Sequence, residues 1–288
     1  MFQSLLSTTQ EQVKVVFENM VNGFDHRLSE PMLYSVLGGK CLRAFLVLES
    51  AKIYGIPEDQ ALRVATAVEA THAYSLIHDD LPCMDNDNIR RGKPTVHIKW
   101  DEALAVLTGD ALQALSFEIL SSPRTSADPV VRLKLITTLS KAIGADGMVL
   151  GQLLDIEAEN LSTPTDLDTI IRLQTKKTGA LIKWSLQAGP LMAGEETDSL
   201  KRFAELLGLA FQIRDDILDL EGESRKVGKK LRKDYTAGKA TFVSLLGLNG
   251  AKKKAISLIN QSIRELETIN GSTGNLKAAA QFVISRDL

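Results

Sequence analysis

The sequence predicts an all-α protein built as a single domain over residues 1–288, and three observations carry this prediction. Glycine and proline are sparse, at 20 and 8 residues of 288. The windows between them are long and rich in Ala, Leu, Glu, Lys and Gln, which have high helix propensity. Apolar residues inside these windows recur three and four positions apart, as on one face of a helix. We see no convincing strand run.

The helices are expected one after another, with ends where turn-forming residues interrupt the apolar pattern. Two windows, 58–80 and 196–221, are apolar around much of their circumference, which is typical of helices buried in a large helical domain. Most connections are short, but about 81–99 and 222–237 are long and crowded with charged residues and glycine, so they are candidate functional loops. The expected helices span 9–28, 31–36, 40–54, 58–80, 100–121, 128–157, 166–190, 196–221, 238–248, 250–268 and 274–285.

The composition excludes several classes of protein. With 44% hydrophobic residues the chain can bury a large core. Lys+Arg 34 against Asp+Glu 36 leaves a net charge of −2, so no global charge recruits nucleic acid or an acidic membrane surface. Cys41 and Cys83 lack metal-ligand spacing and are expected to be free buried thiols in a reducing cytoplasm. The start of the chain lacks a signal-peptide pattern, and no membrane span is expected, so we predict a cytoplasmic protein.

The first acidic motif lies in "LIHDDLPCMDNDNIRRG", residues 76–92, where Asp79 and Asp80 close an expected helix and Asp85 follows. Negative charge at a helix C-terminus opposes the macrodipole, at about 0.3–1 kcal/mol per exposed charge. The arginine pair that follows could offset this charge, and so could a divalent metal, since carboxylates are the ligands that Mg²⁺ prefers. A solvated acidic junction would also explain this stretch when it is taken alone. His72, seven residues before Asp79, lies close to the same helical face and could face the same cavity or be a satisfied core residue.

The second acidic motif is "FQIRDDILDLEG". Asp215 and Asp219 lie one turn apart on one helical face, Asp216 lies at the edge of that face, and Gln212 lies one turn before. The other positions are mostly apolar and leave little room for a second polar side, which favours a functional stripe over a solvated face. These apolar neighbours are Ile213, Ile217, Leu218 and Leu220.

Short basic clusters stand beside glycine in "LGGKCLR", "IRRGKPT", "TKKTGALI" and "KVGKKLRKDYTAGKAT". Glycine allows a close approach of backbone to phosphate, and arginine binds phosphate oxygens in a bidentate manner. None of the clusters has P-loop spacing. Carboxylates can bind a polyanion only through a metal ion, so the two acidic and several basic sites together predict metal-bridged phosphate and directly bound phosphate. Diphosphate esters fit that division.

With these residues in view, the chain resembles the short-chain trans-isoprenyl diphosphate synthases, most closely the bacterial farnesyl type, the geranyltranstransferases. "DDLPCMD" is similar to the first aspartate-rich motif of that family and "DDILD" to the second. The resemblance runs essentially end to end, through "LGGKCLR", "VEATHAYSLIHDDLPCMDNDNIRRGKPT", "LTGDALQALSFEIL", "GQLLDIEAE", "KTGALI", "LGLAFQIRDDILD" and "LNGAKKKA".

The resemblance implies a helical bundle of the isoprenoid synthase type around a deep central cavity, a homodimer, and three Mg²⁺ ions. By its implication the metal-binding residues are Asp79, Asp80, Asp85, Asp215, Asp216 and Asp219, with Asp87 solvated or behind them. The allylic diphosphate would be bound by Arg90, Lys177, Lys229 and Lys239. Isopentenyl diphosphate would be bound by Lys40, Arg43, His72 and Arg91.

The implied reaction condenses dimethylallyl or geranyl diphosphate with isopentenyl diphosphate to give farnesyl diphosphate and free diphosphate. The allylic C–O bond ionises, the double bond of isopentenyl diphosphate attacks the cation, and a proton is lost to the departed diphosphate. Lys177, Thr178 and Gln212 match the catalytic positions, the latter two as polar groups that face the cation. Tyr74 matches a bulky position that stops growth at fifteen carbons, with Ser75 next to it. No side-chain nucleophile is needed.

The chain departs from the family pattern at Cys41 and Ala44 in "GGKCLRA", at Arg232, and at its end, "SRDL", which lacks a lysine. Other interpretations stay open. A geranyl or geranylgeranyl diphosphate synthase would share the same motifs. A His-Asp metal phosphohydrolase could use His78, Asp80 and His72. A terpene cyclase and a noncatalytic prenyl synthase subunit are further alternatives, although the former usually carries an Asn/Ser/Glu second motif and the latter tends to lose its aspartates.

Overall fold

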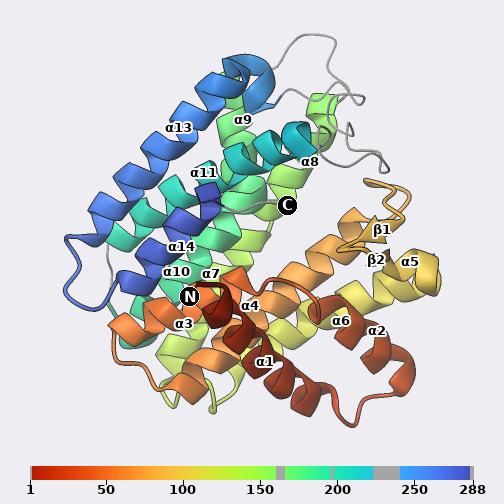
Figure 1. The fold of residues 1–288 in the computed structure, drawn as a ribbon. Coiled ribbons are helices and arrows are strands. Elements are labelled where there is room, and N and C mark those ends of the chain that lie inside the picture. The colour runs from red at the N-terminus through yellow and green to blue at the C-terminus, as the bar shows by residue number, and fades with distance from the viewer. Residues whose placement is uncertain (1, 160–165, 196–197, 223–240, 286–288) are drawn as a thin grey trace. The chain divides into compact units, whose positions relative to one another are not determined.

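The computed structural model describes residues 2–159, 166–195, 198–222 and 241–285, and it forms two compact units, each treated by itself below. The first unit comprises Met1–Thr137 and Ala188–Glu195, and the second comprises Thr138–Gln187 and Glu196–Leu288. The chain passes from one unit to the other within α7 (Pro129–Ile143) and within α10 (Ala180–Ala193). The described residues are helical apart from turns and one short hairpin (Figure 1). The single domain over 1–288 stays a prediction.

Helix α4 (Glu58–Asp79) is the centre of the first unit. It packs against α1 (Phe2–Val21), α2 (His26–Val36), α3 (Leu42–Ile53) and α6 (Glu102–Ser121). Its middle is rich in alanine and valine and is buried on most sides, so neighbouring helices can approach closely. Figure 1 shows α6 running alongside α4. The expectation of a buried helix at 58–80 is confirmed by this packing, and the helix delivers its C-terminal aspartates to the edge of the core.

The second unit is built around the pair of α11 (Asp198–Gly222) and α13 (Phe242–Leu266), which pack along each other (Figure 1). Phe203, Leu207 and Ile213 of α11 are buried. Helix α14 (Gly274–Ser285) packs on this pair. On the same unit, α8 (Met148–Glu159) and α9 (Leu167–Gln174) both contact a π-helical turn, η1 (Thr175–Gly179).

Four expected helices need correction, and one of them is the window 31–36, because α2 begins earlier, at His26. The window 128–157 divides into α7 and α8, because the chain turns tightly at 144–147: a β-carbon on Gly147 would lie 2.1 Å from the Ala142 carbonyl oxygen. The window 166–190 is interrupted by η1. The window 9–28 is wrong at both ends, because α1 begins at Phe2 and ends before Gly23, whose φ is +117°. Asp25 then accepts the Arg27 N–H and caps α2.

The loop expected at 81–99 contains more structure than the sequence indicated. Strands β1 (Ile89–Arg90) and β2 (Lys93–Pro94) pair antiparallel, and the short helix α5 (Val96–Lys99) follows. Two-residue strands are too short to show an alternating pattern, which is why no strand was expected. The break expected near 248–250 is present as a kink at Gly247, with φ +68°, inside α13. Residues 238–240 and the loop 223–237 lie outside the described residues.

Two expectations from composition also meet the structure. Both cysteines are free, but Cys83 is exposed on the loop after α4, so the expectation that both thiols are buried is wrong for that residue. Among the described residues, α6 is long and apolar enough to cross a membrane by length and composition, with 44% of its apolar window buried. Because α6 packs against α4, it has the properties of a core helix.

Candidate functional site

The first acidic motif forms a compact turn at the end of α4. Asp79 is the last residue of the helix, and the backbone N–H of Asp85 donates to the Asp79 carbonyl at 2.9 Å. The N–H of Asp87 donates to the Asp80 carbonyl at 3.1 Å. Asn86 makes the turn possible by adopting a positive φ of 50°. Asp79 and Asp85 are therefore brought together by the backbone itself.

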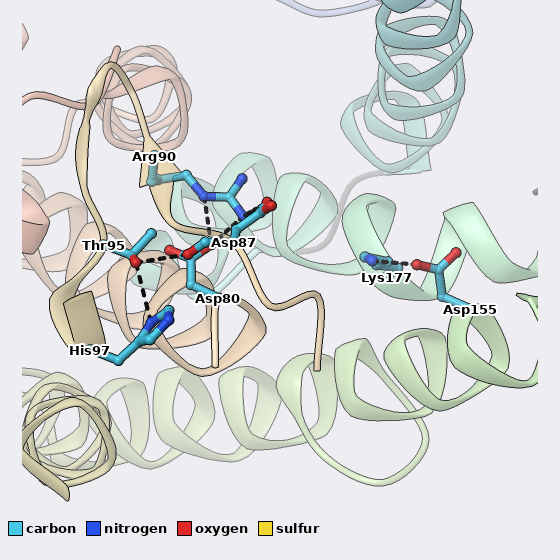
Figure 2. A network of polar contacts seen from close by, with 7 residues as sticks. All are labelled: Asp80, Asp87, Arg90, Thr95, His97, Asp155 and Lys177. Carbon is cyan, nitrogen blue, oxygen red and sulfur yellow. Dashed lines mark hydrogen bonds and ion pairs between the residues drawn. The ribbon is translucent and has the colours of Figure 1, made fainter. Parts of the chain in front are cut away.

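Asp80 is held by Arg90 from the hairpin (Figure 2). The Arg90 Nε and Nη2 atoms donate to one Asp80 oxygen at 2.9 and 2.5 Å, and Nη2 lies 3.5 Å from Asp87. Asp80 is only 4% exposed, and burial raises the pKa of its carboxyl while the hydrogen bond from Arg90 opposes the rise. In this structure Asp80 and Asp87 orient Arg90, whereas Asp85 is exposed and Asp79 is half-buried at the end of α4.

Thr95 fixes the base of this arrangement (Figure 2). Its hydroxyl donates to the Asp87 carbonyl at 2.7 Å and lies 3.2 Å from Nδ1 of His97. A hydroxyl has one proton, so Nδ1–H of His97 is the donor in the second bond. The segment that carries Arg90 is thus fixed by two contacts, one from Arg90 to Asp80 and one from Thr95 to the Asp87 carbonyl.

Arg91 points to a different place from Arg90, because it occupies the two-residue turn of the hairpin. Arg91 has φ +53° and Gly92 has φ +74°, the left-handed pair of a type I′ turn. The Arg91 guanidinium lies against Gly39, where a β-carbon would come within 2.8 Å of Nη1. Gly39 therefore provides the space into which this guanidinium fits, and its own carbonyl accepts from Gln10 at 2.7 Å.

Glu69, which the sequence pattern did not single out, connects the residues expected to bind isopentenyl diphosphate. It is 4% exposed, and Oε1 accepts the Ala44 N–H at 2.9 Å, so its carboxylate caps the start of α3. Cys41, at the N-cap position with φ +49°, makes no side-chain cap. Burial raises the pKa of Glu69, and the Ala44 N–H and the charges of Arg43 and Arg91 oppose the rise. A glutamate inside an otherwise apolar helix, one turn before His72, was the available signal.

His72 shares this environment. Burial lowers its pKa, and the charges of Arg43 and Arg91 lower it further, so the imidazole is neutral near pH 7. Arg43, His72, Arg91 and Glu69 thus form one cluster on the first unit, whereas Lys40 is exposed on the turn that precedes α3.

We expect Glu69→Gln to change how folding stability depends on pH. The ordinary glutamate pKa is 4.5, and burial raises the value in the folded protein. Between these two values the folded protein binds more protons than the unfolded chain, so the wild-type free energy of unfolding falls as pH rises through that window. The variant lacks this loss and should gain stability relative to wild type as pH rises. Urea unfolding between pH 4.5 and 7.5 measures it; exposed Glu102→Gln is the control, and a pH-independent difference for Glu69→Gln contradicts the assignment.

The chain-length candidates lie one turn and more before the first motif. Tyr74 is 5% exposed, and its ring meets the His78 ring edge-on with centroids 5.9 Å apart. Burial raises the pKa of the Tyr74 hydroxyl. The Ser75 hydroxyl donates to the His72 carbonyl at 2.9 Å, a hydrogen bond within α4.

His78 faces α6, and this bears on the phosphohydrolase alternative. Its Nε2 lies 3.2 Å from the Val106 carbonyl oxygen, and a β-carbon on Gly109 would come within 2.0 Å of the same nitrogen. Glycine at position 109 therefore leaves the space that the His78 ring occupies. The His78 ring packs against Gly109, and its Nε2 lies at hydrogen-bonding distance from the Val106 carbonyl. The structure therefore gives no support to His78 as a metal ligand beside Asp80.

On the second unit, η1 presents Lys177 and Thr178. Single π-helical turns are frequent at functional sites because they re-aim side chains relative to a regular helix. Lys177 Nζ lies 2.6 Å from Asp155 Oδ2 on α8 (Figure 2). A β-carbon on Gly151 would come within 2.1 Å of the Lys177 backbone nitrogen, so α8 and η1 are in direct backbone contact. Asp155 lies in the "GQLLDIEAE" segment, and the sequence pattern did not predict a functional role for it.

The second acidic motif continues the face of α11 that packs on η1. A β-carbon on Gly208 would lie 3.4 Å from the α-carbon of Gly179, and Gln212, Asp215 and Asp219 follow at helical spacing along that face. Asp216 has a separate contact: it accepts the Phe242 N–H at 2.7 Å, at the start of α13. The helix expected for this motif is confirmed, and the functional role of the stripe along it stays a prediction.

The donor set suits Mg²⁺. Among the residues that the structure describes, no three His, Cys, Asp or Glu side chains converge to hold a metal ion unaided. Mg²⁺ usually keeps several waters and takes one or two carboxylates together with substrate phosphates, so a motif that offers the half-buried Asp79 and the exposed Asp85 fits it. Lys229 and Lys239, and the departure at Arg232, lie outside the described residues. The roles assigned to the site residues stay predictions.

A helical fold with an aspartate motif at the end of α4, next to Arg90, and a second aspartate motif on α11 is suited to binding diphosphate through a divalent cation. The family model for polyprenyl synthetase matches residues 25–277. A farnesyl diphosphate synthase of Haemophilus influenzae is 42% identical over 99% of this chain and 98% of its own. The chain therefore belongs to the polyprenyl synthetase family.

Solved structures agree with this membership. The apo crystal structure of an FPP/GFPP synthase from Zymomonas mobilis has a TM-score of 0.89 and 44% identity, and covers 98% of each chain. A geranyltransferase of Helicobacter pylori, crystallised with magnesium and isoprenyl diphosphate, has a TM-score of 0.79 and 34% identity, and covers 99% of this chain and 96% of its own. The predicted family, the all-α fold class and the trans-prenyltransferase class of enzyme are confirmed.

Proposed function

We propose that this chain condenses dimethylallyl and geranyl diphosphates with isopentenyl diphosphate to form farnesyl diphosphate, with release of diphosphate. The observation that carries the proposal is the pair of guanidinium sites on one hairpin: Arg90 beside the first aspartate motif, and Arg91 in the cluster with Arg43 and His72. Two diphosphate substrates need two separate basic sites, and one turn provides both.

In this proposal the residues around the allylic substrate stabilise a leaving group. Arg90 and Lys177 bind the diphosphate as the allylic C–O bond ionises, and Mg²⁺, when bound, neutralises the charge that develops on it. The double bond of isopentenyl diphosphate, held by Lys40, Arg43, His72 and Arg91, forms the new C–C bond with the cation. The proton is then transferred to the departed diphosphate. Because His72 is neutral, the positive charge of this pocket comes from Arg43, Arg91 and Lys40.

The metal requirement rests on the two aspartate motifs. Asp79 at the end of α4 and Asp85 in the turn after it, with Asp80 behind them, would hold Mg²⁺ on one side, and Asp215 and Asp219 of α11, with Asp216 at the edge, on the other. We propose three ions, the number that the family resemblance implies. The H. pylori geranyltransferase, complexed with magnesium and isoprenyl diphosphate, supports the cofactor class but not the number of ions.

One incubation tests the proposal. Purified protein, dimethylallyl diphosphate, isopentenyl diphosphate and Mg²⁺ should give a fifteen-carbon product by mass spectrometry, and EDTA should abolish it. Inorganic phosphate released from a nucleotide without prenyl transfer would overturn the proposal in favour of a phosphohydrolase. Absence of product from the chain alone would favour a noncatalytic subunit.

We also propose that the enzyme is a cytoplasmic homodimer that binds no nucleic acid. Val130 and Leu133, one turn apart on α7, are 56% and 63% exposed, and Leu107 of α6 is 56% exposed. Exposed apolar side chains of this size on one unit support a protein contact surface, and a second copy is the partner that the resemblance implies.

Leu133→Glu should convert the dimer to a monomer, because a carboxylate would be buried without a partner in an apolar interface. Sedimentation velocity of the purified protein measures the change. Lys134→Glu, an exposed charge change at the next position, should leave the dimer intact. A dimer that persists in Leu133→Glu contradicts the use of this face.

A further inference from the structure

Asp155 on α8 holds the ammonium of Lys177. Lys177 Nζ lies 2.6 Å from Asp155 Oδ2, and the two side chains are only 22% and 12% exposed (Figure 2). An ion pair this sheltered is screened much less than a surface pair. The lysine predicted to bind the allylic diphosphate therefore meets the substrate with its position already set by a carboxylate of the protein.

The same face of α8 also fixes the backbone that carries Lys177. Gly151 and Asp155 are four residues apart and so lie one above the other on the helix. A β-carbon on Gly151 would come within 2.1 Å of the Lys177 nitrogen and 2.5 Å of its α-carbon, so no other residue fits there without moving η1. Gly151 seats the backbone of Lys177, and Asp155 holds the end of its side chain.

We infer that Asp155 is a positioning residue for the prenyl transfer reaction, an inference that rests on the proposed function. An ammonium has three donors, and one bond to Asp155 leaves two that can reach phosphate oxygens. The carboxylate restricts a side chain with four rotatable bonds, which would otherwise lose that freedom on binding substrate. Asp155 thus prepares Lys177 for the diphosphate and does not itself touch the substrate.

The same turn offers a matched control. Lys176, the neighbour of Lys177 in η1, pairs with Asp146 at 2.9 Å, but Asp146 is 93% exposed. Exposed pairs of this kind contribute little, about 0–1 kcal/mol. Lys176 Nζ also donates to the backbone carbonyl of Asp146, so the two adjacent lysines each pair with one aspartate carboxylate, that of Asp155 sheltered and that of Asp146 in solvent.

The test compares Asp155→Asn with Asp146→Asn in steady-state assays with varied geranyl diphosphate and varied isopentenyl diphosphate. Asp155→Asn should lower kcat/KM for the allylic substrate about 10–100-fold, the range known for losing a group that orients a metal ligand, because Lys177 likewise loses the carboxylate that orients it. The KM for isopentenyl diphosphate should stay at the wild-type value. Asp155→Glu should recover part of the loss, and Asp146→Asn should match wild type throughout.

A second readout does not depend on turnover. Modification of Lys177 by an amine-reactive reagent, followed by peptide mass spectrometry of the free enzyme, should be severalfold faster in Asp155→Asn than in wild type. Lys176 should react at the same rate in both proteins. If the wild type makes no prenyl product, the proposed function fails, and these labelling rates alone decide whether Asp155 holds Lys177.

Two results would overturn the inference. In the first, Asp155→Asn matches wild type in the allylic kcat/KM and in Lys177 labelling. In the second, Asp155→Asn impairs both substrates equally and lowers the melting temperature as Gly151→Ala does, which would mean that Asp155 only supports the fold.

Discussion

Asp79→Asn should lower kcat at saturating substrates by about 10²–10³-fold, the loss typical of removing one group that stabilises charge in a transition state. Asparagine keeps the shape of the side chain but removes the charge. Asp79 ends α4, and the Asp85 N–H donates to its carbonyl at 2.9 Å, so the backbone brings these two residues of the motif together. Without one of them the metal concentration needed for half-maximal activity should also rise, because Mg²⁺ loses a ligand.

The control for Asp79→Asn lies on the same helix. Asp59 is in the first turn of α4, where it interacts with the helix dipole and is far from the motif. Asp59→Asn should keep wild-type turnover and the wild-type dependence on magnesium. Retention of activity within tenfold of wild type in Asp79→Asn, at any magnesium concentration, would sink the assignment of Asp79.

Tyr74→Ala should lengthen the product from fifteen to twenty carbons. The ring is 5% exposed on α4, five residues before the first aspartate of the motif. Truncating a buried aromatic residue to alanine leaves a cavity and costs about 3–5 kcal/mol of stability. A prenyl tail with one more isoprene unit is apolar and can fill that cavity. Incubation with both five-carbon substrates, with product length read by mass spectrometry, measures the change.

Tyr74→Phe is the matched control, because it keeps the ring and removes only the hydroxyl. Its product should remain at fifteen carbons. Thermal unfolding run in parallel separates a change in product from a loss of folded enzyme. An unchanged product length in a folded Tyr74→Ala protein contradicts the assignment, and the stop for chain growth must then lie elsewhere.

Local patterns predicted the helical fold well, because helical periodicity is a property of neighbouring residues. The buried helices around 58–80 and 196–221 followed from it. The break between α7 and α8 did not, because a glycine inside an apolar periodic window is tolerated in a helix and does not reveal a tight turn. The π-helical turn at 175–179 was missed because five residues of "TKKTG" carry no distinguishing period.

The candidate site divides in the same way. The aspartate motifs were visible because their spacing is local, and the basic residues were visible beside glycine. Glu69 and Asp155 were missed because their partners are far away in sequence: Glu69 caps Ala44, 25 residues earlier, and Asp155 meets Lys177, 22 residues later. Such pairings depend on how the helices pack against one another, and helix packing cannot be predicted from the local pattern of a single sequence.

The type I′ turn of the hairpin has a consequence for how the enzyme can change. The two adjacent arginines diverge because Arg90 lies in a strand and Arg91 in the turn that follows it, so that Arg90 contacts Asp80 and Arg91 lies against Gly39. One inserted or deleted residue at this turn would displace the Arg91 guanidinium from Gly39, whereas Arg90 precedes the turn and is held by Asp80. We therefore expect the length of this turn to be constrained by the place that Arg91 occupies, whereas substitutions at Arg90 or at Arg91 can alter the two predicted diphosphate sites one at a time.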